Sequence, residues 1–305
     1  MRTFYPTLSI CALVLASCAG DAGRPDADAG EPALDERAAQ LDAAAAADEG
    51  TSPLAEGPSL SVVRPFPGGV HGMAVSGTGR LFFSDSFGNV SSTRRVYALD
   101  PPYTGAFAAT KITGALPAGL LFDDGLLYVC DVAASRVRAF DAKLRGVKEW
   151  HPATPWGIAR LPGGALVTVS NDGVVQRLEP DGAVTTLFGG LDAPFGIAAA
   201  ADGTVWVSEQ GVGAGRVTRR SLDGAVLETV AYPWDNPEGL LVDHQGVLWV
   251  AETGLRQLVR YDGSAATTFA SNIGLPVVIT RRDADTLLIN SANLPAQLMA
   301  LEESR

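Results

Sequence analysis

An internal repeat that begins near residue 70 restricts the fold of this chain more than any other feature. A short apolar segment that contains or follows a glycine recurs as HGMAV, AGLLF, WGIAR, FGIAA, EGLLV and PVVIT. The reference positions of the six segments are Gly72, Gly119, Gly157, Gly196, Gly239 and Val278. Successive positions are 47, 38, 39, 43 and 39 residues apart. A period near 40 that is built from strand-like segments is typical of β-propeller blades, so the chain is predicted to be an all-β, six-bladed propeller.

Each repeat has the pattern of four antiparallel strands. The first strand is followed by a turn such as Asp202-Gly203, and the second strand by a third that ends at an acidic residue, as in VYALD and LVRYD. A fourth segment alternates polar and apolar residues, as in AVTTLF. Prolines cluster just before the predicted first strands, where they are expected to mark loops: Pro117, Pro155, Pro194, Pro237 and Pro276.

The two ends of the repeat region are predicted to join. The sixth repeat stops after its third strand, at Leu301-Glu302, whereas residues 59–66, SLSVVRPF, form a spare strand before the first blade. Pairing of this strand with the last blade would remove the open edges of the ring. The propeller domain is therefore expected to span residues 59–305, closed by residues 59–66.

The segments GIAAAADGTVWVSE, GLLVDHQGVLWVAE and RVTRRSLDG resemble NHL-type repeats. They are also similar to the six-bladed propellers of the senescence-marker-protein, gluconolactonase and luciferin-regenerating-enzyme group. The resemblance covers all six repeats, roughly residues 70–305. It implies the propeller fold strongly and an activity weakly, because the shared residues are mainly those that build a blade.

Candidate site residues lie at one face of the predicted ring. In a four-stranded meander the start of the first strand and the end of the second lie at the same face, near the central channel, where a pocket is expected. The starts of the first strands supply His71, Ala118, Trp156, Phe195, Glu238 and Val277. The ends of the second strands supply Asp85, Asp131, Ser170 with Asn171, Glu209, Glu252, and Asn290 with Ser291.

Two interpretations of the acidic residues among these remain open. Asp85, Asp131, Glu209 and Glu252 occupy one equivalent position in four blades, and such repetition favours a structural role in tying down the turn into the third strand. The alternative is an acidic funnel that attracts a cation or a basic ligand.

Glu238 and His71 differ from the apolar residues found at most equivalent positions. Asn236-Pro237-Glu238-Gly239 resembles the Pro-Asp-Gly motif of the gluconolactonase group, which implies that Glu238 is a metal ligand and catalytic base. By the same resemblance, His71 stands at a Glu ligand position, and Trp156 and Phe195 stand at Asn ligand positions. Ca²⁺ prefers several oxygen ligands, so Asn171, Glu209 or Asp85 would have to supply the missing ones.

The cofactor expectation is accordingly a divalent cation, Ca²⁺ or Zn²⁺, with Glu238, His71, Asp85 and Glu209 as the candidate ligands. A transition-metal site formed by His71, His151 and Glu238 is a further alternative. The match to streptogramin lyases fails at their catalytic histidine, because Gly211 and Gly254 stand two residues after Glu209 and Glu252.

Aromatic residues at the predicted mouth of the channel are candidate ligand-binding groups. Trp156, Phe195 and Trp234 could stack on a sugar ring or another planar ligand, with His71 and Asn171 beside them. Packing of these rings against loop prolines is the alternative. Trp206 and Trp249 lie inside second strands and are expected to be core residues.

The first residues have the pattern of a lipoprotein signal peptide, predicted to span residues 1–17. The apolar run from Thr7 to Ser17 is shorter than the roughly 20 residues that a spanning helix needs. Leu15-Ala16-Ser17-Cys18 resembles a bacterial lipobox, which implies that Cys18 is acylated. An ordinary signal peptide cleaved near Ala19 is the alternative. By resemblance to Gram-negative sorting rules, the protein is expected to be exported and lipid-anchored, in the outer membrane or periplasm.

Residues 18–58 are expected to comprise the lipidated cysteine and a disordered acidic linker. Residues 19–58 carry a net charge of −8, and residues 59–305 carry −4 of the total of −11. Neither part is basic, which argues against a nucleic-acid partner. Cys130 is expected to be a buried thiol in the core.

These observations lead to one leading functional hypothesis and two alternatives. The leading one is a cell-envelope propeller, expected to be a monomer, that binds a small molecule or a protein partner at its mouth. The first alternative is a metal-dependent hydrolase of the lactonase type that uses Glu238. The second is a structural or assembly lipoprotein.

Overall fold

The computed structural model describes residues 59–67, 69–86, 90, 94–210, 214–292 and 296–302. The chain divides into two units, Met1–Gly57 and Pro58–Arg305, and the first lies outside the described residues. The predicted signal peptide, Cys18 and the linker therefore stay predictions. Within the described ranges no helix is long and apolar enough to cross a membrane.

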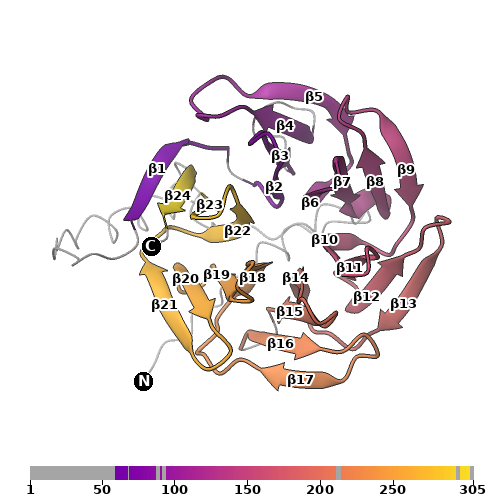
Figure 1. Cartoon of the computed structure of the whole chain (residues 1–305), viewed down its shortest axis with the longest axis vertical. Helices are drawn as coiled ribbons and strands as arrows, with labels where there is room; N and C mark the ends of the chain where they lie inside the picture. The colour runs from indigo at the N-terminus through magenta and orange to yellow at the C-terminus, as the bar shows by residue number, and fades with distance from the viewer. Residues whose placement is uncertain are drawn as a thin grey trace, which may run out of the picture. The chain divides into compact units, whose positions relative to one another are not determined.

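Six four-stranded antiparallel sheets are arranged around a common axis, as the sequence predicted (Figure 1). Blade 1 consists of β2 (Met73–Val75), β3 (Leu81–Asp85), β4 (Arg95–Leu99) and β5 (Ala108–Thr113). Blade 2 consists of β6 (Pro117–Asp123), β7 (Leu126–Asp131), β8 (Arg136–Phe140) and β9 (Gly146–Trp150), with a short 3₁₀ turn at Val132–Ala134. Blade 3 consists of β10 (Pro155–Arg160), β11 (Leu166–Ser170), β12 (Val174–Leu178) and β13 (Val184–Phe188).

The second half of the ring repeats this plan. Blade 4 consists of β14 (Pro194–Ala199), β15 (Val205–Glu209), β16 (Arg216–Arg220) and β17 (Val226–Thr229). Blade 5 consists of β18 (Pro237–Val242), β19 (Leu248–Glu252), β20 (Gln257–Tyr261) and β21 (Ala266–Ser271). Blade 6 consists of β22 (Pro276–Arg281), β23 (Thr286–Ser291), β24 (Gln297–Glu302) and β1 (Ser59–Pro65).

The predicted closure of the ring is confirmed. Strand β1 pairs antiparallel with β24, from Ser59 opposite Glu302 to Pro65 opposite Gln297, and so completes the last blade. Next to this strand, Phe66 packs against the rings of Phe83 and Phe107 in the first blade. The ends of the propeller sequence are thus joined by backbone pairing and by an aromatic contact between blades 6 and 1.

The inner strands begin at proline in five blades. Pro117, Pro155, Pro194, Pro237 and Pro276 are the first residues of their strands, rather than residues of the preceding loops as expected. A proline at the first position of a strand is tolerated, because that position need not donate a hydrogen bond to the ladder.

The hydrophobic core lies between adjacent blades. One apolar cluster joins blades 3 and 4 around Val167, Val169, Val205 and Val207, and another joins blades 5 and 6 around Trp249, Leu258 and Ile289. The predicted core residue Trp206 belongs to the cluster between blades 4 and 5. The second strands of blades 3 to 6 are buried along their whole length, whereas most residues of the outer strands are exposed or half-buried.

Candidate functional site at the mouth of the channel

Glycines bring the inner strands of neighbouring blades into close contact. A β-carbon on Gly72 would lie 2.1 Å from the carbonyl oxygen of Ala118, and one on Gly119 would lie 2.3 Å from that of Trp156. The same relation recurs from Gly157 to Phe195, from Gly196 to Glu238 and from Gly239 to Val277. No side chain fits at these positions, which explains why the glycine repeats in five blades. The residue before each glycine is thereby held at the mouth, where the inner strands start.

Three aromatic side chains from three blades meet at this level. The ring centroids of His71 and Trp156 are 5.4 Å apart, those of Trp156 and Phe195 are 5.3 Å apart, and those of His71 and Phe195 are 6.1 Å apart. All three side chains are at least 94% buried. We call His71, Trp156 and Phe195 the aromatic triad. The sequence placed these residues at one face, and the structure brings them into contact.

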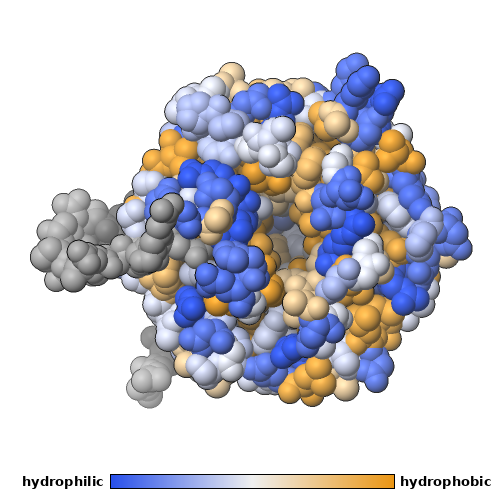
Figure 2. Space-filling model, in the orientation of Figure 1, coloured by the Kyte–Doolittle hydropathy of each residue, from blue (hydrophilic) through white to orange (hydrophobic). Residues whose placement is uncertain are grey.

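The aromatic triad lines a cavity of about 80 Å³ on the axis of the ring. Figure 2 shows the hollow at the centre of the blades. The rest of the described cavity wall is apolar, and besides glycines it consists of Met73, Leu120, Ile158, Ile197, Leu240, Val278 and Ile279. No lining residue is an Asp, Glu, Lys or Arg among those the structure describes. The cavity therefore favours a small occupant, or one end of a larger one.

Burial affects the protonation of His71 and the hydrogen bonding of Trp156. Burial lowers the pKa of His71 to about 4, so its imidazole is neutral at pH 7. The indole nitrogen of Trp156 is buried and has no hydrogen-bond partner among the described residues. A buried N–H group without an acceptor costs about 1–3 kcal/mol, which makes this donor a candidate hydrogen-bond partner for a ligand.

Glu238 lies in a buried polar network beside the triad. Its Oε1 accepts hydrogen bonds from Asn236 Nδ2 at 2.8 Å and from Gln210 Nε2 at 3.3 Å. Burial raises the pKa of the Glu238 carboxyl to about 8, and the nearby charge of Glu252 adds to the increase. The protonated form of Glu238 therefore predominates at pH 7.

Glu252 is the acidic neighbour of Glu238 in this network. Its Oε1 accepts hydrogen bonds from the backbone N–H groups of Asn236 and Gly254, at 2.7 and 3.1 Å. Burial raises its pKa to about 6, although these donors oppose the increase. Asn236 connects the two acids, because its side chain contacts Glu238 and its backbone contacts Glu252.

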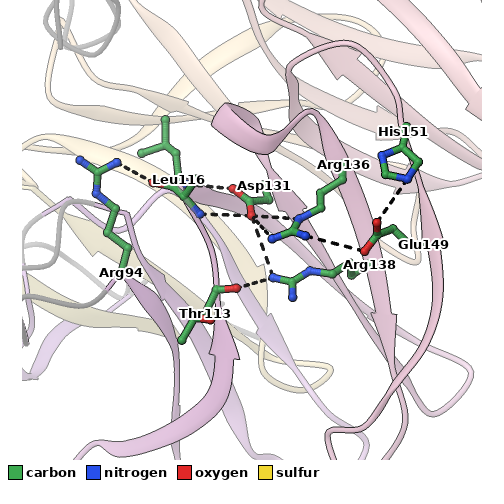
Figure 3. Close-up of polar contacts among 9 residues, drawn as sticks. Arg94, Thr113, Leu116, Asp131, Arg136, Arg138, Glu149 and His151 are labelled. Atoms are coloured by element: carbon green, nitrogen blue, oxygen red, sulfur yellow. Dashed lines mark hydrogen bonds and ion pairs between the residues drawn. The ribbon is translucent and has the colours of Figure 1, made fainter. Parts of the chain in front are cut away.

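The acidic residues that end the second strands have the predicted structural role. Asp131 accepts hydrogen bonds from the backbone N–H of Leu116, in the loop that enters β6, and from Arg136 (Figure 3). Glu209 accepts one from the backbone of Asp192 and two from Arg216. Burial acts to raise the pKa of Glu209, but hydrogen bonds from Arg216 and Asp192 hold it below its ordinary value.

Hydroxyl groups take the same place in two blades. Ser291 Oγ accepts a hydrogen bond from the backbone of Leu275, and Ser170 Oγ contacts Thr154 Oγ1 at 2.8 Å. Asp85 differs, since it accepts a hydrogen bond from Val90 in the turn toward the third strand. The sequence predicted contacts with the turn into the third strand. Most of these residues instead accept hydrogen bonds from the loop before the first strand.

The candidate metal ligands are not gathered into one cluster. Nowhere in the described ranges do three His, Cys, Asp or Glu side chains lie close enough to hold one ion. Glu209 and Asp85 bond to their own blades, away from the triad. His151, offered as a partner of His71, instead contacts Glu149 at 3.2 Å with 71% of its side chain exposed (Figure 3).

Two other predicted ligand-binding residues lie apart from the triad. Trp234 packs in the core between blades 4 and 5, its indole donates to the carbonyl of Val230 at 3.0 Å, and its ring contacts Tyr232. This arrangement favours the packing alternative for Trp234. Asn171 is half-buried at the end of β11 and does not line the cavity.

Sequence reasoning missed Gln210 and Asn236 as members of the Glu238 network. Gln210 directly follows the second-strand acid Glu209, and Asn236 stands two residues before Glu238. Each could have been found by examining the loops on either side of the repeat positions. Their amides matter because, among the described residues, they and Thr253 offer hydrogen bonds to the buried Glu238 carboxyl.

Comparison with known proteins supports the fold. No family model and no curated protein sequence matches the chain. A gluconolactonase from Xanthomonas campestris superimposes with a TM-score of 0.66 at 21% identity, covering 81% of this chain and 89% of that structure. A streptogramin B lyase matches with a TM-score of 0.62 at 15% identity, covering 81% and 98%.

A third neighbour catalyses a different kind of reaction. The aldose sugar dehydrogenase from Streptomyces coelicolor, solved with bound PQQ, matches with a TM-score of 0.59 at 17% identity, covering 81% of this chain and 99% of that structure. Three activities on one architecture show that the fold does not decide the reaction. The described part of the chain is a six-bladed β-propeller, and its structural neighbours are gluconolactonase-like and streptogramin B lyase propellers.

Proposed function

We propose that this chain is a cell-envelope lipoprotein whose propeller binds a small molecule at the mouth of its channel. The convergence of His71, Trp156 and Phe195 over one cavity carries this proposal. Concave sites lined by aromatic and apolar groups, with few polar ones, are typical of small-molecule binding. The fold neighbours, all described as enzymes of small molecules, are consistent with such a site.

The size of the cavity limits what it can enclose. At about 10–15 Å³ for each water molecule, 80 Å³ holds roughly five to eight waters. A drug-sized ligand needs about 300–1,000 Å³. A larger ligand would insert one end between the rings and leave the remainder outside the mouth.

A thermal-shift screen of metabolites on the full-length protein tests the binding proposal. Replacement of Phe195 by Leu keeps an apolar side chain but removes one ring of the triad, so it should weaken binding of any hit. Replacement of Phe122 by Leu, in a half-buried position between blades 1 and 2, is the matched control and should not. Hits that stabilise both variants equally would place the binding site elsewhere.

Glu238 supports a second candidate function, a hydrolase that acts on lactones or esters. Its pKa near 8 is suited to a general acid or base, and a gluconolactonase is among the fold neighbours. Hydrolysis of a lactone panel, with Ca²⁺, Mn²⁺ or Zn²⁺ added, would be lost on replacement of Glu238 by Gln. No activity and no thermal shift with any metal would leave binding as the function.

The envelope location is part of the proposal and rests on the sequence around Cys18. Cells that express the full-length chain should incorporate labelled palmitate into it, and replacement of Cys18 by Ser should abolish the label. Retention of the label in Cys18→Ser would exclude this cysteine as the anchor. Release of an unlabelled protein into the periplasm would favour an ordinary signal peptide.

A further inference from the structure

The indole nitrogen of Trp156 differs from those of three other buried tryptophans. Trp150 donates to the carbonyl of Glu179 at 2.7 Å, Trp234 to that of Val230 at 3.0 Å, and Trp249 to Asp243 Oδ2 at 3.0 Å. Trp156 has no such acceptor in the described part of the chain, although its Nε1 is buried and its side chain lines the cavity. The fold therefore leaves a hydrogen-bond donor unused where a ligand would enter.

The surroundings of this donor are electrically neutral. The described cavity wall consists of glycines, aliphatic residues, Met73 and the aromatic triad. None of the lining residues that the structure describes is an Asp, Glu, Lys or Arg. Glu238, in the same ring position of blade 5, does not line the cavity.

An ionic ligand would find no partner of opposite charge in such a cavity. Burial of an unpaired charge is far more costly than burial of a neutral polar group that keeps one hydrogen bond. Glu252 accepts backbone hydrogen bonds through Oε1, and its Oε2 is buried without a hydrogen-bond partner among the described residues, but Glu252 does not line the cavity. A ligand that places a carboxylate or an ammonium group in the cavity is therefore disfavoured.

We infer that the ligand of the mouth is uncharged and inserts an acceptor oxygen, such as a carbonyl or ether, toward Trp156 Nε1. Its apolar part would pack against Phe195, His71 and the aliphatic side chains of the cavity wall. The inference rests on the proposed binding function and specifies its ligand class. Trp156 then has two roles, as a wall of the site and as its hydrogen-bond donor.

The inference can be tested on the full-length protein with three compounds that share a five-membered carbon ring: cyclopentanone, cyclopentylammonium and cyclopentanecarboxylate. They have similar shapes and differ in charge. The protein is labelled with ¹⁵N in the tryptophan indoles, which number five in the chain. The Trp156 signal is identified by its absence in Trp156→Phe. Cyclopentanone should shift this signal saturably, and the two ions should bind at least about tenfold more weakly at pH 7.

A variant pair tests the hydrogen bond itself. Trp156→Phe keeps a ring in the triad but removes the donor, so cyclopentanone affinity should fall about 2- to 10-fold. Trp206→Phe removes an indole from the core between blades 4 and 5 and should leave the affinity unchanged. Equal affinity in Trp156→Phe and the parent protein would overturn the assignment of Trp156 as donor.

The remaining outcomes separate this inference from the proposed function. Saturable binding of either ion at the Trp156 signal, as tight as that of cyclopentanone, would overturn the neutral-ligand inference and leave the binding site intact. If none of the three compounds shifts the Trp156 signal while metabolites found in the thermal-shift screen do, the ligand class is wrong. If no compound of either set shifts it, both proposals fail.

Discussion

The carbonyl oxygen of Trp156 lies against Gly119 of the preceding blade, where a β-carbon would be only 2.3 Å from it. The same residue lines the cavity. The contact that packs blade 2 against blade 3 thus also fixes the backbone of a candidate ligand-binding residue. Packing of the inner strands and construction of the mouth are therefore coupled.

Replacement of Gly119 by Ala should destabilise the propeller strongly. The new methyl group meets backbone atoms, which cannot move without separating the two blades, and overpacking of this kind costs about 1–3 kcal/mol or more. The melting temperature should fall by roughly 5–10 °C. Gly163→Ala is the control, because nothing lies within 4 Å of the added carbon. Similar melting temperatures for the two variants would contradict the close approach.

Deletion of residues 59–65 should destabilise the whole domain rather than one blade. The deletion removes the outer strand of blade 6 and its pairing with β24, and it exposes the open edge of the ring. Differential scanning calorimetry should show one transition at a lower temperature. Deletion of residues 40–46, which has the same length, should have little effect. An unchanged melting temperature after the first deletion would show that closure adds no stability.

Asn290→Ala should weaken the seam between blades 6 and 1. Asn290 Oδ1 accepts a hydrogen bond from Val278 N–H at 2.8 Å, and its Nδ2 donates to Val70 O at 3.0 Å. Loss of the side chain leaves two buried groups unsatisfied, so urea denaturation should show a loss of about 2–4 kcal/mol. Ser84, the equivalent residue in blade 1, has one contact of 3.5 Å, and Ser84→Ala should cost much less.

The stability of the folded domain should decline as the pH rises from 6.5 to about 9. The pKa of Glu238 is raised to about 8 from an ordinary 4.5, so the folded state binds the proton more tightly than the unfolded state does. This contribution is fully present below pH 4.5 and is lost as the pH rises through 8. Its decline above pH 6.5 amounts to about 2 kcal/mol.

Glu238→Gln is the variant that isolates this effect. The amide oxygen can still accept from Asn236 and Gln210 but does not titrate, so the free energy of unfolding should vary less across this range. The window avoids His71, whose pKa is lowered to about 4 and whose own contribution increases between pH 4 and 6.5. Identical pH profiles for the variant and the parent protein would show that Glu238 titrates normally.

The fold could be predicted from the sequence because a similar local sequence pattern recurs from blade to blade. The glycine of five inner strands, the buried second strand and the acid at its end in four blades recur at nearly constant spacing. The closing strand was predictable because the sixth repeat lacks one strand and residues 59–66 supply it. The site was predictable only as a set of positions at one face.

Contacts between blades were not predictable in the same way. Trp234 and Trp156 both stand near the mouth in sequence, yet one indole is bonded within the core and the other lines the cavity without an acceptor. His151 and Asp85 carry suitable ligand atoms, but the paths of their strands direct them to other partners. The sequence pattern alone does not distinguish these outcomes, because each depends on which acceptor or donor atoms the folded chain brings within hydrogen-bond distance.

The sequence alone determined the number of blades, their strand order and the positions that face the mouth, since periodicity and strand alternation are local properties of the chain. Tertiary structure decided which of those positions form a site. The meeting of His71, Trp156 and Phe195, the burial that keeps His71 and Glu238 neutral at pH 7, and the unused N–H of Trp156 all arise from residues in different blades. Burial and distance between distant segments exist only once the ring has closed.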